Sequence, residues 1–329
     1  MLHNLQLVRA FAALNVVLFH VIGTSPSYGF PVGGLSVLEG WGSNGVDLFF
    51  VLSGFIMFHS QRGKGASWGR FLYMRVIRIV PTYWFLTLLL FFLIAFFPGI
   101  FRSGVLDPQL LFFSLFFLSW GALGGTPYLY LGWTLEFEFI FYVIFAVSLL
   151  LKRPGQAVYF VAGAFLVLVF GLNITSIFLE FVFGAVLALL TQSRQFSSTV
   201  GWAAFLLGAA LLAAQIFYPL KEFLPRSVFS GIPATFVVFG MVVLPQRRLG
   251  LLGILGDASY SIYLIQVFTI PAYLKLLVLM GVEPSHGELL GVLNLAVTVA
   301  GGWLLYALFE RPVTQALKNY ASRQRVADP

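Results

Sequence analysis

The chain consists of long apolar runs separated by short polar loops, and this pattern constrains the fold more than any other feature. A helix needs about 17 to 25 apolar residues to cross the hydrocarbon core of a membrane. Runs near or within that length span 4–24, 45–60, 79–97, 131–151, 157–172, 175–191, 199–218, 228–245, 258–281 and 289–309. Only 9% of the 329 residues are charged, against about a quarter in water-soluble domains. The sequence therefore predicts an all-α fold, a polytopic bundle of about ten membrane-spanning helices.

The composition limits the chemistry that this chain can perform. It contains no cysteine, which excludes disulfides, thiolate metal ligation and a thiol nucleophile. The net charge is +7, but the basic residues are scattered through short loops and form no patch typical of nucleic-acid binding. No repeat or long polar tract interrupts the runs, so we expect one integral-membrane domain over residues 1–329, without a metal site. The first run lacks a signal-peptide pattern, and we expect it to remain as a spanning helix.

A further apolar piece, 109–120, is short for a crossing and is either an eleventh helix or a re-entrant segment. The positive-inside rule favours the second alternative. With a cytoplasmic N-terminus and no crossing at 109–120, the cytoplasmic side receives Arg9, Arg62, Lys64, Arg70, Arg75, Arg78, Lys152, Arg153, Arg194, Arg247, Arg248, Arg311, Lys318, Arg323 and Arg325. The other side receives only Arg102, Lys221, Arg226 and Lys275. We therefore predict that both termini are cytoplasmic.

Two ionisable residues, Arg9 and His20, lie on the first run, where a charge costs at least a few kcal/mol. They are eleven residues apart, so in a helix they share one face and are separated by roughly 16 Å along its axis. In the predicted orientation Arg9 lies near the cytoplasmic interface and His20 lies deeper. The pair suits phosphate binding at one end and proton transfer at the other. The alternatives are an interfacial arginine that snorkels and a hydrogen-bonded core histidine.

Three carboxylates lie near the predicted outer ends of the second and fourth spanning runs. Asp47 opens the second run, where it either caps the helix or, at the depth of His20, orients the imidazole. Glu136 and Glu138 open the fourth run. Two residues apart on a helix, they point about 200° away from each other, so at most one faces a given cavity. The other is expected to face solvent or lipid headgroups.

Arg75 and Arg78 lie three residues apart, just before Pro81, so they stack on one face of a helix. They are either snorkelling anchors or a pair of guanidiniums that binds a polyphosphorylated ligand. The sequence has no glycine-rich phosphate loop, which argues against nucleotide hydrolysis.

Taken in chain order, these segments resemble the acyltransferase 3 family of integral-membrane O-acyltransferases, which modify bacterial surface sugars. The first run resembles the family's Arg-x10-His helix through Arg9 and His20, and "GVDLFFVLSGF" (45–55) resembles its second helix. Other matching positions are Arg75, Arg78, Pro81, Tyr83, Trp133, Glu138, Phe141, Tyr142, Ser259, Tyr260, Ser261, Tyr263, Leu264, Glu310, Arg311 and Pro312. The chain is most similar to the short members associated with exopolysaccharide, which lack an appended esterase-like domain. It departs from the pattern at Gln266, where many relatives have histidine, and at Glu136, an extra carboxylate.

The resemblance implies transfer of an acyl group, usually acetyl, from cytoplasmic acyl-CoA to a hydroxyl of a surface or exopolysaccharide sugar, or of its lipid-linked precursor. The reaction would cross the bacterial inner membrane. His20 would be the general base or a transient acyl carrier, and Asp47 and Glu138 would orient it or position the acceptor. The implied cofactor-binding residues are Arg9, Arg75 and Arg78, and the implied sugar-binding residues are Trp133 and Tyr142. Acyl-CoA is expected as a donor substrate, with no tightly bound cofactor.

A transporter or flippase of a lipid-linked saccharide is the main alternative, because ionisable residues inside a membrane also mark translocation pathways. A relative that acylates or racemises amino acids is a further alternative. We expect contacts with membrane lipids in every case, and none with nucleic acid.

Overall fold

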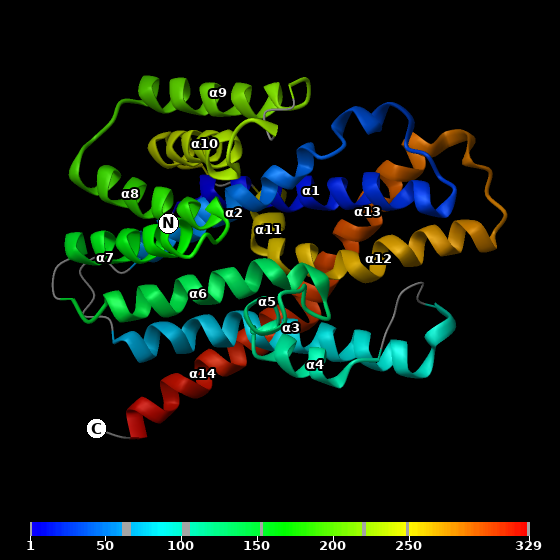
Figure 1. Ribbon diagram of the computed structural model, residues 1–329, viewed down its shortest axis with the longest axis horizontal. Coiled ribbons are helices and arrows are strands. Elements are labelled where there is room, and N and C mark those ends of the chain that lie inside the picture. The colour runs from blue at the N-terminus through cyan, green and yellow to red at the C-terminus, as the bar shows by residue number, and fades with distance from the viewer. Residues whose placement is uncertain are drawn as a thin grey trace.

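The computed structural model describes residues 2–60, 67–100, 106–151, 154–218, 222–247 and 250–327. Within these residues the regular secondary structure is helical, with no β-strand. Long helices run along the length of the molecule, and both chain ends lie at the same end of it, at the left of Figure 1. The predicted all-α polytopic bundle is confirmed.

The spanning helices fall close to the predicted runs. Among the described residues, the seven helical segments long and apolar enough to cross a membrane are Asn4–Tyr28, Trp41–Ser60, Trp68–Phe96, Tyr130–Ser148, Ser176–Ser193, Ser259–Leu279 and Pro284–Arg323. Three shorter apolar helices are Gln156–Gly171, Ser198–Ala214 and Ser227–Val243. Their α-helical parts are α1 (Asn4–Thr24), α2 (Asn44–Ser60), α3 (Trp68–Phe96), α6 (Trp133–Ser148), α7 (Pro154–Leu166), α8 (Leu179–Ser193), α9 (Ser198–Ala214), α10 (Ile232–Val243), α12 (Ser259–Leu279) and α13 (Gly287–Leu305).

The ends of two of these helices differ from the prediction. The third helix, α3, begins eleven residues before the predicted run at 79–97, so it carries Arg75 and Arg78 within it. The last span continues from α13 through a π-helical turn (Tyr306–Glu310) into the polar helix α14 (Arg311–Ala327). A short helix, α11 (Gly250–Asp257), precedes α12 and packs against α1.

The apolar piece at 109–120 forms two short helices, α4 (Pro108–Leu115) and α5 (Ser119–Leu123), instead of an eleventh span. Glu136 of α6 holds this segment, because its carboxylate accepts the backbone N–H groups of Ser119 (3.0 Å) and Trp120 (2.7 Å). Glu136 is only 1% exposed. Of Glu136 and Glu138, the one outside the cavity was expected to face solvent or lipid headgroups. That expectation is wrong, because Glu136 is buried and its carboxylate binds backbone amides.

Some of the basic residues that set the predicted topology lie outside the described residues: Arg62, Lys64, Arg102, Lys152, Arg153, Lys221 and Arg248. The assignment of cytoplasmic and outer sides stays a prediction from the sequence.

Helix α2 lies at the centre of the bundle and packs closely against α1 and α8. A Cβ on Gly54 would lie 2.1 Å from the carbonyl oxygen of Phe181, and one on Gly184 would lie 2.1 Å from that of Val51. Only glycine permits such contact between helix backbones, as is common in membrane proteins. Phenyl rings fill the space beside this crossing, and Phe141 stacks on Phe181 with centroids 4.5 Å apart.

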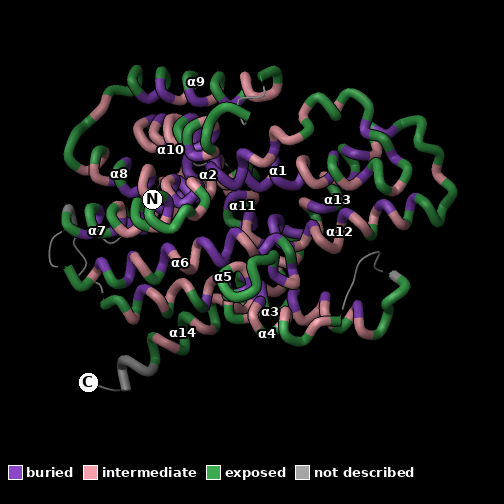
Figure 2. Tube along the Cα trace, in the orientation of Figure 1, coloured by how far each residue is buried: buried purple, intermediate pink, exposed green. Residues whose placement is uncertain are grey.

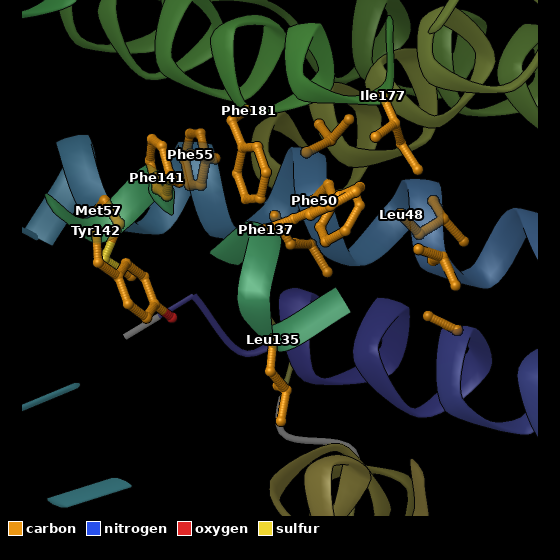
Figure 3. Close-up of a cluster of buried hydrophobic side chains, with 14 of the residues drawn as sticks. Leu48, Phe50, Phe55, Met57, Leu135, Phe137, Phe141, Tyr142, Ile177 and Phe181 are labelled. Carbon is orange, nitrogen blue, oxygen red and sulfur yellow. The ribbon is translucent and has the colours of Figure 1, made fainter. Parts of the chain in front are cut away.

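The burial pattern agrees with this arrangement. Buried residues follow α1 and α2 along their length, whereas the outer helix α9 is largely exposed (Figure 2). Figure 3 shows Phe50, Phe137 and Phe181 between α2, α6 and α8, with the hydroxyl of Tyr142 directed away from these rings. The aromatic cluster thereby fixes α6 against α2, and these two helices carry much of the candidate site.

Replacing Gly54 by alanine tests the close approach. The added Cβ meets backbone that cannot rotate away, so we expect destabilisation of about 1–3 kcal/mol, typical of overpacked cores. The matched control is Gly163→Ala on α7, where nothing lies within 4 Å of the added carbon. Thermal unfolding in detergent should show a lower Tm for Gly54→Ala alone. Equal melting temperatures for the two variants would contradict the crossing geometry.

Candidate active site

A cavity lies among α1, α2, α3, α6 and α12, and it occupies about 800 Å³ when its opening to solvent is included. Its walls combine apolar side chains of α2 with polar groups from every one of these helices. The polar lining residues are Arg9, Ser53, Arg75, Arg78, Thr134, Glu138, Tyr142, Ser259, Tyr260 and Tyr263. The structure thus brings together all three arginines of the predicted donor site, with Glu138 and Tyr142.

The three arginines of this cavity form no ion pair with any carboxylate of the described residues. Within the described residues, the one ion pair with nitrogen and oxygen less than 4 Å apart joins Arg226 and Asp47. Arg9 donates a hydrogen bond from Nη1 to Gln6 Oε1 (3.2 Å). The Arg75 guanidinium lies over the ring of Tyr142, 5.9 Å from its centroid, and its buried Nε has no hydrogen-bond partner. Guanidiniums that lie together without an ion-pair partner form a site suited to a phosphate or another multiply charged anion.

Glu138 is the carboxylate among the described lining residues of this cavity. Buried Glu310, which accepts a hydrogen bond from Ser261, also acts electrostatically on Arg9 and Arg78. Oε1 of Glu138 accepts hydrogen bonds from the hydroxyls of Ser53 (2.6 Å) and Tyr142 (2.5 Å). Since both hydroxyls donate to the same oxygen, the carboxylate is held in one orientation between α2 and α6. Oε2 accepts no hydrogen bond from the described residues and stays available to a ligand.

Residues of α12 form part of the cavity wall. The Tyr260 hydroxyl donates to the carbonyl of Ile79 (2.8 Å) and ties α12 to α3. The Tyr263 hydroxyl donates to the carbonyl of Leu131 (3.0 Å) and lies 2.9 Å from Thr134 Oγ1. These bonds fix two tyrosine rings in the cavity wall.

His20 does not line this cavity. Its Nδ1 lies 2.8 Å from the carbonyl oxygen of Val16, which can only accept, so the neutral ring carries its hydrogen on Nδ1 and its lone pair on Nε2. The ring packs beside Tyr130 and interacts with the side chain of Gln266. Gln266 donates from Nε2 to the carbonyl of Tyr263 (2.7 Å). Tyr263 therefore belongs to the cavity wall and also connects, through Gln266, to the surroundings of His20.

Gln266 lies on α12, with its side chain near His20. The side chain is 1% exposed, and its Oε1 has no partner with hydrogen-bond geometry. A buried carbonyl oxygen without a donor is unfavourable by about 1–3 kcal/mol, which makes this amide a natural position for an approaching hydrogen-bond donor.

Asp47 pairs with Arg226 instead of His20. Its two oxygens accept bonds from Arg226 Nε (2.9 Å) and Nη2 (3.0 Å), and Nη2 also donates to the carbonyl of Ser43 (3.0 Å). Asp47 is fully buried, whereas the side chain of Arg226 is 30% exposed. The expected contact in which Asp47 orients the imidazole is therefore not the one that the structure shows.

Glu180 is a buried acid that the sequence interpretation missed. It lies in the first turn of α8, is 0% exposed, and neither carboxyl oxygen has a hydrogen-bond partner among the described groups. It interacts with both Asp47 and Arg226. Two buried carboxyl groups thus lie near one guanidinium, and only Asp47 binds it directly. An acidic residue inside the apolar run 175–191 was the available signal.

Trp133 also lies away from the cavity lining. It is half-buried and makes edge contacts with Phe50 and Phe137, with centroids 6.4 and 5.4 Å away. Of the predicted site residues, the cavity unites Arg9, Arg75, Arg78, Glu138 and Tyr142, and leaves His20, Asp47 and Trp133 outside its lining. In the described part of the chain, no three histidine or acidic side chains gather in a way that would hold a metal ion.

Comparisons with known proteins identify the family of this chain. The acyltransferase domain model of the acyltransferase 3 family matches residues 2–307. The chain belongs to this family. It is 33% identical over 294 residues to the "Exopolysaccharide production protein ExoZ" of Rhizobium meliloti (strain 1021), covering 83% of this chain and 89% of that protein. No solved structure matches this acyltransferase.

The ion pair between Asp47 and Arg226, outside the arginine-lined cavity, gives a stability prediction. Asp47→Asn removes the carboxylate that binds the Arg226 guanidinium in a largely buried setting. Breaking a fully buried pair in this way costs about 3–5 kcal/mol. We expect the lower end, about 3 kcal/mol, because Arg226 is partly exposed. The double variant Asp47→Asn/Arg226→Gln should regain part of this loss.

Thermal unfolding of the single and double variants measures this coupling, with Glu283→Gln in an exposed loop as control. A double variant whose destabilisation equals the sum of the two single effects would contradict the pairing of Asp47 with Arg226.

Proposed function

We propose that this acyltransferase moves an acyl group, acetyl in the first instance, from cytoplasmic acyl-CoA to a hydroxyl of an exopolysaccharide sugar or its lipid-linked precursor. The observation that carries the proposal is the convergence of Arg9, Arg75 and Arg78 on one cavity without an ionic partner among the described residues. Membership in the acyltransferase 3 family and the similarity to an exopolysaccharide production protein support it.

The donor half of the proposal follows from charge and shape. Acyl-CoA carries several phosphate charges at one end and a flexible pantetheine arm with amides at the other. Guanidiniums bind phosphates through paired, charge-assisted hydrogen bonds. The hydroxyls of Ser259 and Tyr260 and the free Oε2 of Glu138 line the cavity beyond the arginines and suit the amide groups of the arm. Tyr142, predicted to bind sugar, lies in this cavity and is better placed to contact the donor.

The chemical step is assigned to His20. As general base, Nε2 takes the proton of the acceptor hydroxyl while the oxygen attacks the thioester carbonyl, the new C–O bond forms and the C–S bond breaks. The leaving thiolate then takes the proton from the imidazolium. As acyl carrier, the same Nε2 attacks the thioester carbonyl, the C–S bond breaks and CoA leaves as the thiolate. The acceptor oxygen then attacks the acyl group, the C–N bond breaks to return the imidazole, and the thiolate takes the hydroxyl proton. In both schemes the acyl end of the donor would leave the cavity near Tyr263, a lining residue whose backbone carbonyl accepts a hydrogen bond from Gln266, the neighbour of His20.

The orientation in the membrane completes the proposal. Both termini and the arginine end of the cavity would face the cytoplasm, where acyl-CoA is made, and the protein would lie in the bacterial inner membrane. The distribution of basic loop residues supports this topology. Asp47 and Arg226 would lie toward the outer side, where Asp47 holds the arginine in place and Trp133 remains a predicted sugar contact.

Acyl transfer in proteoliposomes tests the proposal. With radiolabelled acetyl-CoA and a saccharide-lipid acceptor, the unaltered protein should label the acceptor, and His20→Ala should lower the rate by about 10²–10⁴-fold, as for loss of a general base. The control is His286→Ala, an exposed residue beyond α12. Translocation of the saccharide without any labelled product would instead establish the transporter alternative.

A further inference from the structure

A second cavity opens beside the first, at the C-terminal end of α2 and the N-terminal end of α1. It occupies about 700 Å³ with its opening to solvent, and its lining includes Gln6, Arg9, Phe55, Ile56, His59 and Ser60. Arg9 and Ile56 line both cavities. The two hollows therefore meet at a guanidinium.

Arg9 interacts with both sides of this junction. Its Nη1 donates to Gln6, which lines the second cavity, while Arg78 and Glu138 of the first cavity act on it electrostatically. A phosphate bound to Arg9 would thus have a hollow on either side. A ligand that fits must carry its negative charge in the middle and a different group at each end.

The lining of the second cavity includes two aromatic rings and two polar side chains. The rings of Phe55 and His59 are stacked, 5.2 Å apart with an angle of 18° between their planes. His59 is exposed and Ser60 half-buried at the end of α2. Aromatic faces of this kind stack on nucleobases with little dependence on which base is present, and Ser60 and Gln6 add hydrogen-bonding groups at the rim.

We infer that the second cavity is the adenosine subsite of the donor. In this arrangement the adenosine 3′-phosphate half of acyl-CoA occupies the hollow beside His59, the diphosphate lies on Arg9 and extends toward Arg75 or Arg78, and the pantetheine arm continues into the first cavity. This assignment rests on the proposed function, since it presupposes an acyl-CoA donor. In this assignment the second cavity recognises the nucleotide of the donor, and the first cavity recognises its pantetheine arm.

A comparison of two donors tests the assignment. Acetyl-CoA carries the adenosine half, and acetyl-4′-phosphopantetheine lacks it. We expect His59→Ala to raise KM for acetyl-CoA about tenfold with kcat little changed, and to reduce the preference for acetyl-CoA over the truncated donor by the same factor. His286→Ala should leave the preference unchanged. An unaltered preference in His59→Ala would overturn the subsite.

A second variant and a binding measurement distinguish loss of the subsite from misfolding of the His59→Ala protein. Ser60→Trp fills the hollow without removing an existing ring, and it should abolish the rise in Tm that adenosine 3′,5′-bisphosphate gives with the unaltered protein. If the bisphosphate still stabilises Ser60→Trp equally, the nucleotide binds elsewhere and the assignment is wrong. Active transfer with an unchanged donor preference rejects the subsite alone, whereas absence of transfer by the unaltered protein rejects the proposed function as well.

Discussion

Three guanidiniums that converge inside a membrane-spanning bundle are the constraint on which the rest of this structure depends. Charges at this depth are unfavourable unless they are paired or face water or a ligand. Here Arg9, Arg75 and Arg78 line one cavity, and Glu138 is the carboxylate in its described lining. The excess of positive charge explains why the cavity stays open and polar instead of being filled by the phenyl rings that pack beside it. It also selects an anionic ligand.

The scaffold holds that charge in place through α2. Glycine at position 54 lets this helix touch α8 directly, and Ser53, one residue earlier, fixes Glu138 from the neighbouring helix. At the other end of α2, Asp47 binds Arg226 and draws in the start of the segment that leads to α10. One helix thus joins the arginine-lined cavity to the second charged cluster. The motif 45–55 is therefore better explained by these three attachments than by direct contact with the histidine.

The sequence predicted the spans well because hydrophobic length is a local property. Arginines in or beside apolar runs were identifiable for the same reason, and the structure gathers them into one cavity. The partner of Asp47 was not predictable, since Arg226 lies 179 residues away and belongs to a connecting segment. The burial of Glu136 depends on backbone amides of a short helix, which leave no side-chain signal. The separation of His20 from the cavity lining depends on how α12 packs, which periodicity alone does not fix.

The central claim is that the arginine cavity receives the anionic end of an acyl donor that reaches toward His20. A structure determined with a non-hydrolysable thioether analogue of acetyl-CoA tests it most directly. The account predicts phosphate oxygens within hydrogen-bond distance of Arg9 and of Arg75 or Arg78, with Tyr263 displaced and the acyl carbonyl close to His20 Nε2. An analogue bound elsewhere, with these arginines unoccupied and His20 closed off behind Tyr263, would contradict it.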